Sequence, residues 1–176
     1  DFPSAKLALD LVDRLNGSCL WFKVGMELYY AAGNSLVETL RDRGFNVFLD
    51  LKLHDIPNTV AGAVRSATRA GASLLTIHAA GGPAMMSAAA EAAAAPGAPR
   101  LLAVTVLTSM DAAELTAVGV SASPAEQVRL LARLSRQAGI DGLVGAADVA
   151  GAGRAELGRE ALLVVPGVRP GVSEVG

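Results

Sequence analysis

Three charged residues lie close together in residues 48–59, FLDLKLHDIPNT, a segment that otherwise has the composition of a buried strand. Asp50 and Lys52 are two positions apart, and Asp55 follows three positions later. A lysine held between carboxylates stays protonated and can donate a proton, while a carboxylate beside it can repel or replace an anionic group of a substrate. This combination suits a reaction that forms a carbanion and then protonates it.

Alternation along a strand predicts how these side chains are arranged. Side chains of a strand point to its two faces in turn, so Asp50 and Lys52 are expected on one face together with Phe48. The opposite face is expected to carry three apolar residues: Val47, Leu49 and Leu51. If the apolar face packs on helices, Lys23 of the preceding strand can lie beside Asp50 and Lys52. A Lys-Asp-Lys row is predicted, with Asp55 just beyond it in the loop.

An ion-pair network that merely closes one end of the core is the alternative interpretation of one Lys/Asp pair. Removing an ion from water costs several kcal/mol unless geometry and hydrogen bonds compensate, and apolar replacements are often equally stable. Stability is therefore a poor reason for gathering the four charges of Lys23, Asp50, Lys52 and Asp55. Chemistry is the better reason.

Other reactive residue types are scarce. His54 and His78 are the only histidines and Cys19 is the only cysteine, so the chain has no Cys/His zinc pattern. A metal site would need carboxylates, with His78 in support, and we predict no metal. No G-x-S-x-G elbow is present, so Ser109 is expected to contact a ligand rather than attack one.

Residues 164–176, VVPGVRPGVSEVG, place Arg169 among glycines and prolines after a predicted strand. A guanidinium and unpaired backbone N–H groups are suited to phosphate. An ordinary connection with a solvent-exposed arginine explains the same segment, and the segment alone favours that interpretation.

The elements that position these residues alternate between two kinds. Apolar runs rich in β-branched residues predict strands at 20–25, 46–52, 74–80, 101–107, 142–147 and 162–168. Amphipathic segments predict helices at 4–16, 27–43, 57–70, 83–94, 124–138 and 148–157. Ser123 before Pro124, with Glu126 behind it, is typical of a capped helix start. The alternation predicts an α/β fold, either a (β/α)8 TIM barrel or an open doubly wound sheet.

Polar residues gather at the carboxyl ends of several predicted strands, which favours the barrel because barrel enzymes build their sites at that end. The chain has no G-x-G-x-x-G after its first strand and no G-x-x-x-x-G-K-[ST]. Six predicted strands are two fewer than eight. We therefore expect one barrel domain over residues 1–176 that is incomplete at both ends, lacking most of the first strand and the eighth strand.

Composition limits the partners. Charged residues make up 18% of the chain, compared with about 25% in typical soluble proteins, and the formal net charge is −2. Without a basic patch a nucleic-acid surface is not expected, and no run of about 18 apolar residues predicts a membrane span. A small-molecule substrate and a reducing, cytoplasmic location are predicted.

The quoted segments resemble the orotidine 5'-phosphate decarboxylase family. The resemblance rests on the D-x-K-x-x-D pattern with its I-P-N-T continuation in FLDLKLHDIPNT, and on LWFKVGMELYYAAG, LLTIHAAGG, LLAVTVLTSM and VVPGVRP, in matching order and spacing. It implies a (β/α)8 barrel, a homodimer with shared active sites, no metal or organic cofactor, and conversion of orotidine 5'-phosphate to UMP and CO2 in pyrimidine nucleotide synthesis.

The resemblance also implies roles for single residues. Lys52 would donate the proton to C6, Asp50 would lie near the departing carboxylate, and Lys23 would hold Asp50 and the ribose. Residues implied to bind substrate or to reach the partner's site are Asp1, Asp55, Ile56, Thr59, Thr108, Ser109, Pro166 and Arg169.

The sequence departs from the family pattern at its ends, where a phosphate-binding arginine of the eighth strand is not present. We therefore expect the sequence to be part of a longer, active protein. Two other functions stay open: a Mg-dependent sugar-phosphate decarboxylase or aldolase of the same barrel superfamily, and a non-catalytic barrel that binds a nucleotide. IPNT and the missing metal ligands weigh against the first of these.

Overall fold

Parallel strands alternate with helices along the chain in the computed structural model, which describes residues 2–15, 17–140, 142–146, 150–158 and 160–166. The described strands are β1 Trp21–Gly25, β2 Asn46–Leu53, β3 Leu74–His78, β4 Arg100–Val104, β5 Gly142–Val144 and β6 Leu162–Val164. The described α-helices are α1 Ala5–Leu15, α2 Met26–Ala32, α3 Asn34–Asp42, α4 Pro57–Ala70, α5 Gly82–Ala92, α6 Ala112–Ala117, α7 Pro124–Gln137 and α8 Ala150–Leu157. The predicted α/β class is confirmed.

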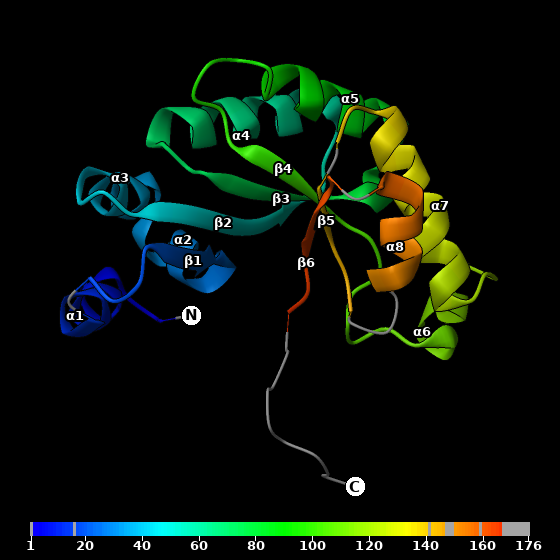
Figure 1. Ribbon diagram of the computed structural model, residues 1–176, viewed down its shortest axis with the longest axis horizontal. Coiled ribbons are helices and arrows are strands. Elements are labelled where there is room, and N and C mark those ends of the chain that lie inside the picture. Colours follow the sequence, from blue (N-terminus) through cyan, green and yellow to red (C-terminus); the bar gives the residue numbers. More distant parts are fainter. Residues whose placement is uncertain (1, 16, 141, 147–149, 159, 167–176) are drawn as a thin grey trace, which may run out of the picture.

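The described strands form one sheet in the order β1-β2-β3-β4-β5-β6, and every neighbouring pair is parallel. A doubly wound sheet reverses its strand order at a switch point, and these six strands run without a reversal. The helices lie outside the curved sheet, as Figure 1 shows. The described part is therefore a half-barrel.

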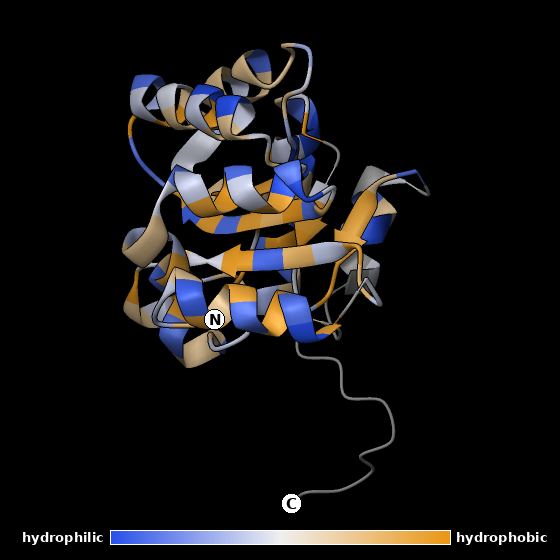
Figure 2. Ribbon diagram, turned by 90° about the vertical axis from the view of Figure 1, so that its left-hand side faces the viewer, coloured by the Kyte–Doolittle hydropathy of each residue, from blue (hydrophilic) through white to orange (hydrophobic). Residues whose placement is uncertain are grey.

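The core lies between the sheet and these helices. Its strand residues include Val47, Leu49 and Leu75, each at most 1% exposed, and its helix residues include Val37 and Val64, both fully buried. The strands are coloured mainly as hydrophobic and the helices as mixed in Figure 2. Among the described residues, no helix is both long enough and apolar enough to cross a bilayer.

One helix prediction needs correction, and one helix was missed. The helix expected over 27–43 is broken at Gly33, whose φ of 65° separates α2 from α3. Only glycine adopts such a φ readily, and the backbone cannot stay helical there. The apolar period of the side chains nevertheless continues across Gly33, which is why one helix was expected. The helix α6 was not predicted; it begins at Ala112, directly after the N-cap residue Asp111, whose side chain accepts a hydrogen bond from the Glu114 N–H at 2.9 Å.

Strand ends differ from the predictions by a few residues. The strand expected over 101–107 ends at Val104, and the one expected over 74–80 ends at His78, where the short 3₁₀ helix η1 Ala79–Gly81 follows. Helix starts are closer: Pro57 begins α4, and Ser123 and Glu126 form a capping box at α7, as their spacing predicted.

Candidate active site

Two lysines meet the two oxygens of one aspartate at the carboxyl end of the sheet. Lys52 Nζ lies 2.9 Å from Asp50 Oδ1, and Lys23 Nζ lies 3.4 Å from Asp50 Oδ2. The strand register brings them together, because Gly25 of β1 is opposite Asp50 of β2 and Lys23 is two positions before it. The predicted Lys-Asp-Lys row is confirmed as an arrangement in space.

Asp50 is held ionised by these neighbours. Its side chain is only 14% exposed, and burial by itself acts to raise the pKa of the carboxyl. The hydrogen bond and charge of Lys52, the hydroxyl of Thr76 and the charge of Lys23 together outweigh burial and leave the pKa of Asp50 below its ordinary value. The carboxylate therefore presents a fixed negative charge between two ammonium groups.

The backbone at Lys52 departs from the extended strand that the alternation assumed. Its φ of 50° is the only positive φ of a non-glycine residue in the described part of the chain. The ladder shifts there as well: Leu49 is opposite Leu75 and Leu53 is opposite Ile77, so four residue steps of β2 span two of β3. The Lys52 side chain still contacts Asp50, although the end of the strand that carries Lys52 is distorted.

The expected apolar face persists despite the distortion, although its last residue is less buried. Val47 and Leu49 are buried against the helices as predicted. Leu51, which was expected to join them, packs against the same core but is only half-buried, because it also lines a surface pocket. The predicted division of faces is therefore confirmed, with less complete burial after Asp50.

Thr76 belongs to the same cluster and was not predicted. Its hydroxyl donates to Asp50 Oδ1 at 3.0 Å and accepts from the Lys52 N–H at 2.8 Å. A polar residue in the middle of the apolar strand LLTIH is the sequence signal that could have identified it.

The two histidines lie side by side next to the cluster. The ring centroids of His54 and His78 are 5.4 Å apart, with an angle of 37° between the planes. Burial, followed by the charges of His54 and Lys52, lowers the pKa of His78 below its ordinary value. His78 is therefore a neutral side chain at physiological pH.

Asp55, Ile56 and Thr59 lie on the outside of this cluster. Asp55 is exposed, and its Oδ1 accepts a hydrogen bond from the Ile56 N–H at 2.6 Å. Ile56 is 67% exposed. Asp55 and Thr59 line a pocket of about 290 Å³ that also includes Lys52 and Tyr30.

The remaining predicted site residues are only partly described. Thr108 and Ser109 are exposed in the loop after β4, and Pro166 is exposed just beyond β6. Asp1 and Arg169 lie outside the described residues. Among the residues that the structure covers, no group of three or more His, Cys, Asp or Glu side chains is arranged to hold a metal ion.

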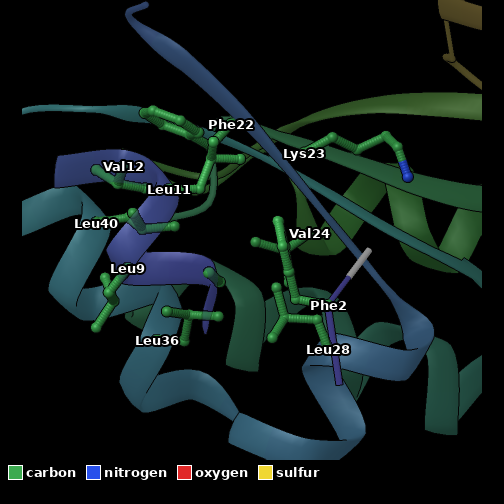
Figure 3. A pocket seen from close by; sticks show the side chains of 11 residues that line it. Phe2, Leu9, Leu11, Val12, Phe22, Lys23, Val24, Leu28, Leu36 and Leu40 are labelled. Atoms are coloured by element: carbon green, nitrogen blue, oxygen red, sulfur yellow. The ribbon is translucent and has the colours of Figure 1, made fainter. Parts of the chain in front are cut away.

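A separate cavity of about 230 Å³ lies between α1 and β1. Side chains such as Leu11 and Phe22 make its wall apolar, and Lys23 extends away from them in Figure 3. An apolar wall does not suit a charged substrate. The chemistry that the charged cluster can perform, in which an ammonium protonates a carbon next to a carboxylate, is therefore not assigned to this cavity.

Comparison with known proteins identifies relatives of the whole chain. Residues 1–176 match the model of the family described as "Orotidine 5'-phosphate decarboxylase / HUMPS family". An orotidine 5'-phosphate decarboxylase of Nitrosococcus oceani is 50% identical over 171 residues, which cover 97% of this chain and 74% of that protein. A protein of the same name from Pseudoalteromonas translucida is 49% identical over 178 residues, covering 100% of this chain and 76% of that protein.

Solved structures show the same similarity. The crystal structure of orotidine 5'-phosphate decarboxylase from Lactobacillus acidophilus has a TM-score of 0.89 and 34% identity, covering 97% of this chain and 79% of that one. An uncharacterized conserved protein from Geobacillus kaustophilus has the same TM-score at 42% identity, covering 94% of this chain and 80% of that one.

Proposed function

The chain belongs to the orotidine 5'-phosphate decarboxylase / HUMPS family, and from that premise we propose that Lys52 is the proton donor of its reaction. The function is decarboxylation of orotidine 5'-phosphate to UMP in pyrimidine nucleotide synthesis, which makes the chain an enzyme, a decarboxylase of the lyase class. The observation that carries the assignment of Lys52 is its contact with a largely buried carboxylate that Lys23 also contacts.

The reaction needs little beyond this arrangement. The bond between C6 of the pyrimidine and its carboxylate breaks, CO2 leaves, and the electron pair stays on C6. The Lys52 ammonium stabilises that negative charge as it develops and then transfers its proton to C6. Asp50 would lie near the departing carboxylate, whose negative charge it disfavours.

The substrate contacts of the other site residues are also proposals. Lys23 would hold Asp50 in place and reach the ribose, which its 48% exposed side chain allows. Further substrate contacts are proposed for Asp1, Thr108, Ser109, Pro166 and Arg169.

We further propose that the protein is a homodimer with shared active sites. Exposed apolar side chains support it: Tyr30 is 83% exposed and Met26 is 45% exposed, and both line the pocket that also includes Asp55 and Thr59. Ile56, next to Asp55 in the sequence, is 67% exposed, and clustered apolar surface is typical of an interaction site. In the dimer Asp55, Ile56 and Thr59 would reach the site of the partner.

Mixing two inactive variants tests the shared site. Asp55→Ala and Lys52→Ala chains should together recover about a quarter of the wild-type activity, because random exchange makes half of the dimers mixed and each mixed dimer keeps one intact site. Each variant exchanged with itself is the control. If mixed preparations stay as inactive as the controls, the sites are not shared.

The six described strands support an eight-stranded barrel, since they occupy consecutive positions and match structures of which the chain covers about four fifths. We propose that the protein completes this barrel and acts in the cytoplasm. A crystal structure of the protein expressed from its intact gene, together with fractionation of the cell, tests both points.

The activity is tested by following the loss of orotidine 5'-phosphate absorbance with EDTA present. Turnover that EDTA leaves unchanged is expected, since Lys52 supplies the charge and the proton. Turnover that EDTA abolishes would show that a metal ion takes part in the reaction, as the Mg-dependent alternative requires. Binding of UMP without turnover would indicate a non-catalytic nucleotide-binding barrel.

A further inference from the structure

Thr76 has a hydroxyl in a place where packing alone would favour a hydrocarbon. It lies between Leu75 and Ile77 on β3, and all three residues are fully buried. Valine has nearly the same shape, and burying a hydroxyl is unfavourable unless it is hydrogen-bonded. The hydroxyl is therefore retained for the contacts it makes.

Both contacts of that hydroxyl go to the charged cluster. Its proton is donated to Asp50 Oδ1 at 3.0 Å, the oxygen that also binds Lys52 Nζ at 2.9 Å. Its lone pair accepts the Lys52 N–H at 2.8 Å. Thr76 thus holds the carboxylate of Asp50 and the backbone of Lys52 at the same time.

The Lys52 N–H needs this acceptor because β2 leaves the regular ladder there. The register between β2 and β3 shifts between Leu49 and Leu53, and Lys52 has a φ of 50°. A non-glycine residue keeps such a conformation only when its surroundings enforce it. The Thr76 hydroxyl supplies that constraint on the side of β3.

We propose that Thr76 is a positioning residue, which fixes the geometry of the Lys52 ammonium relative to the Asp50 carboxylate and does not itself touch the substrate. The proposal rests on the proposed roles of Lys52 and Asp50. It extends the site to β3, so that three successive strands determine where the proton donor lies.

The test compares Thr76→Val, which keeps the shape and removes the hydroxyl, with Thr76→Ser, which keeps the hydroxyl. Thr76→Val should lower kcat roughly 10- to 100-fold, as expected for a displaced catalytic group, with KM nearly unchanged. Thr76→Ser should recover most of that loss. Thr68→Val is the control, because it removes a hydroxyl that bonds only to the Val64 carbonyl within α4.

A second readout does not depend on turnover. Since the Thr76 hydroxyl helps to lower the pKa of Asp50, the pKa of that carboxyl, followed by ¹³C NMR, should rise in Thr76→Val and return in Thr76→Ser. Exchange of the Lys52 amide hydrogen should accelerate in Thr76→Val only. If Thr76→Val does not fold, Thr76→Ala and Thr76→Ser give the same comparison, because both lose the methyl group and differ in the hydroxyl.

The outcomes separate the two proposals. An unchanged Asp50 pKa and Lys52 exchange rate in Thr76→Val, or a Thr76→Ser variant no better than Thr76→Val, overturns the positioning role. Wild-type protein that does not decarboxylate orotidine 5'-phosphate refutes the proposed function, while the NMR readout still decides the role of Thr76.

Discussion

Replacing Lys52 by alanine removes both the proposed proton donor and one of the two cations on Asp50. A positioned general acid contributes about 10²- to 10⁴-fold to a rate, and a preorganised group that stabilises developing charge contributes about 10²- to 10³-fold. If the two contributions multiply, kcat should fall by about 10⁴- to 10⁷-fold. At about 1.36 kcal/mol for each factor of ten, this corresponds to roughly 5–10 kcal/mol of lost transition-state stabilisation.

The same change should leave the protein folded. Breaking a fully buried ion pair costs about 3–5 kcal/mol, but the side chains of Lys52 and Asp50 are 29% and 14% exposed. Solvent screening reduces the cost, and Lys23 and Thr76 still contact the carboxylate. We expect a loss of about 1–2 kcal/mol in the free energy of unfolding, far smaller than the effect on turnover.

The assay measures the loss of orotidine 5'-phosphate absorbance and, separately, the affinity for UMP. Lys52→Ala should bind UMP while its turnover is undetectable. Lys6→Ala is the matched control, because Lys6 also pairs with an aspartate, Asp10 at 2.9 Å, but its side chain is 82% exposed on α1. A folded Lys52→Ala variant that keeps kcat within tenfold of the wild type would show that the proton comes from elsewhere.

Three further predictions concern charge and stability. The pKa of Asp50 lies below its ordinary value of 3.8. The stability that the wild type gains over Asp50→Asn should therefore be complete above pH 3.8 and disappear as pH falls through the lowered pKa. Urea unfolding across this range measures the difference in stability, and a difference that does not depend on pH contradicts the prediction. In an NMR titration the pKa of His78 should lie below 6.5 and should rise in Lys52→Ala, since the Lys52 charge contributes to the lowering; no rise would show that this charge does not reach the imidazole. Ser123→Ala should lower the free energy of unfolding by about 1 kcal/mol, because it removes the cap of α7. Ser87→Ala, at an exposed position in α5, is the control and should not lower it. Urea unfolding measures both variants, and equal effects would mean that the capping box does not stabilise the protein.

Local signals explain which parts of the fold could be predicted. Pro57, Ser123 and Glu126 act on their own turns, so the starts of α4 and α7 follow from the sequence. Gly33 could not be placed as a break by the apolar period, because the side-chain pattern continues while the backbone turns. The helix α6 is too short for a period, and the spacing of Asp111 and Glu114 is its main signal.

The site residues also divide into those that the sequence could predict and those that it could not. Asp50 and Lys23 meet because parallel neighbouring strands place them there, which alternation and strand order predict. Thr76 and the distorted backbone of Lys52 depend on the register between β2 and β3, and register is a property of two segments together. Alternation along a single strand therefore could not identify Thr76.

The left-handed backbone of Lys52 sets stability against activity at one position. At a φ of 50° a glycine would be accommodated with less strain than any residue that carries a Cβ atom. Relief of that strain in Lys52→Gly would therefore offset part of the stability that is lost with the ion pair to Asp50, whereas Lys52→Ala keeps the strain. A screen for heat resistance alone would then tolerate a glycine that lacks the ammonium group, so directed evolution of a more stable enzyme has to include turnover as a selected property.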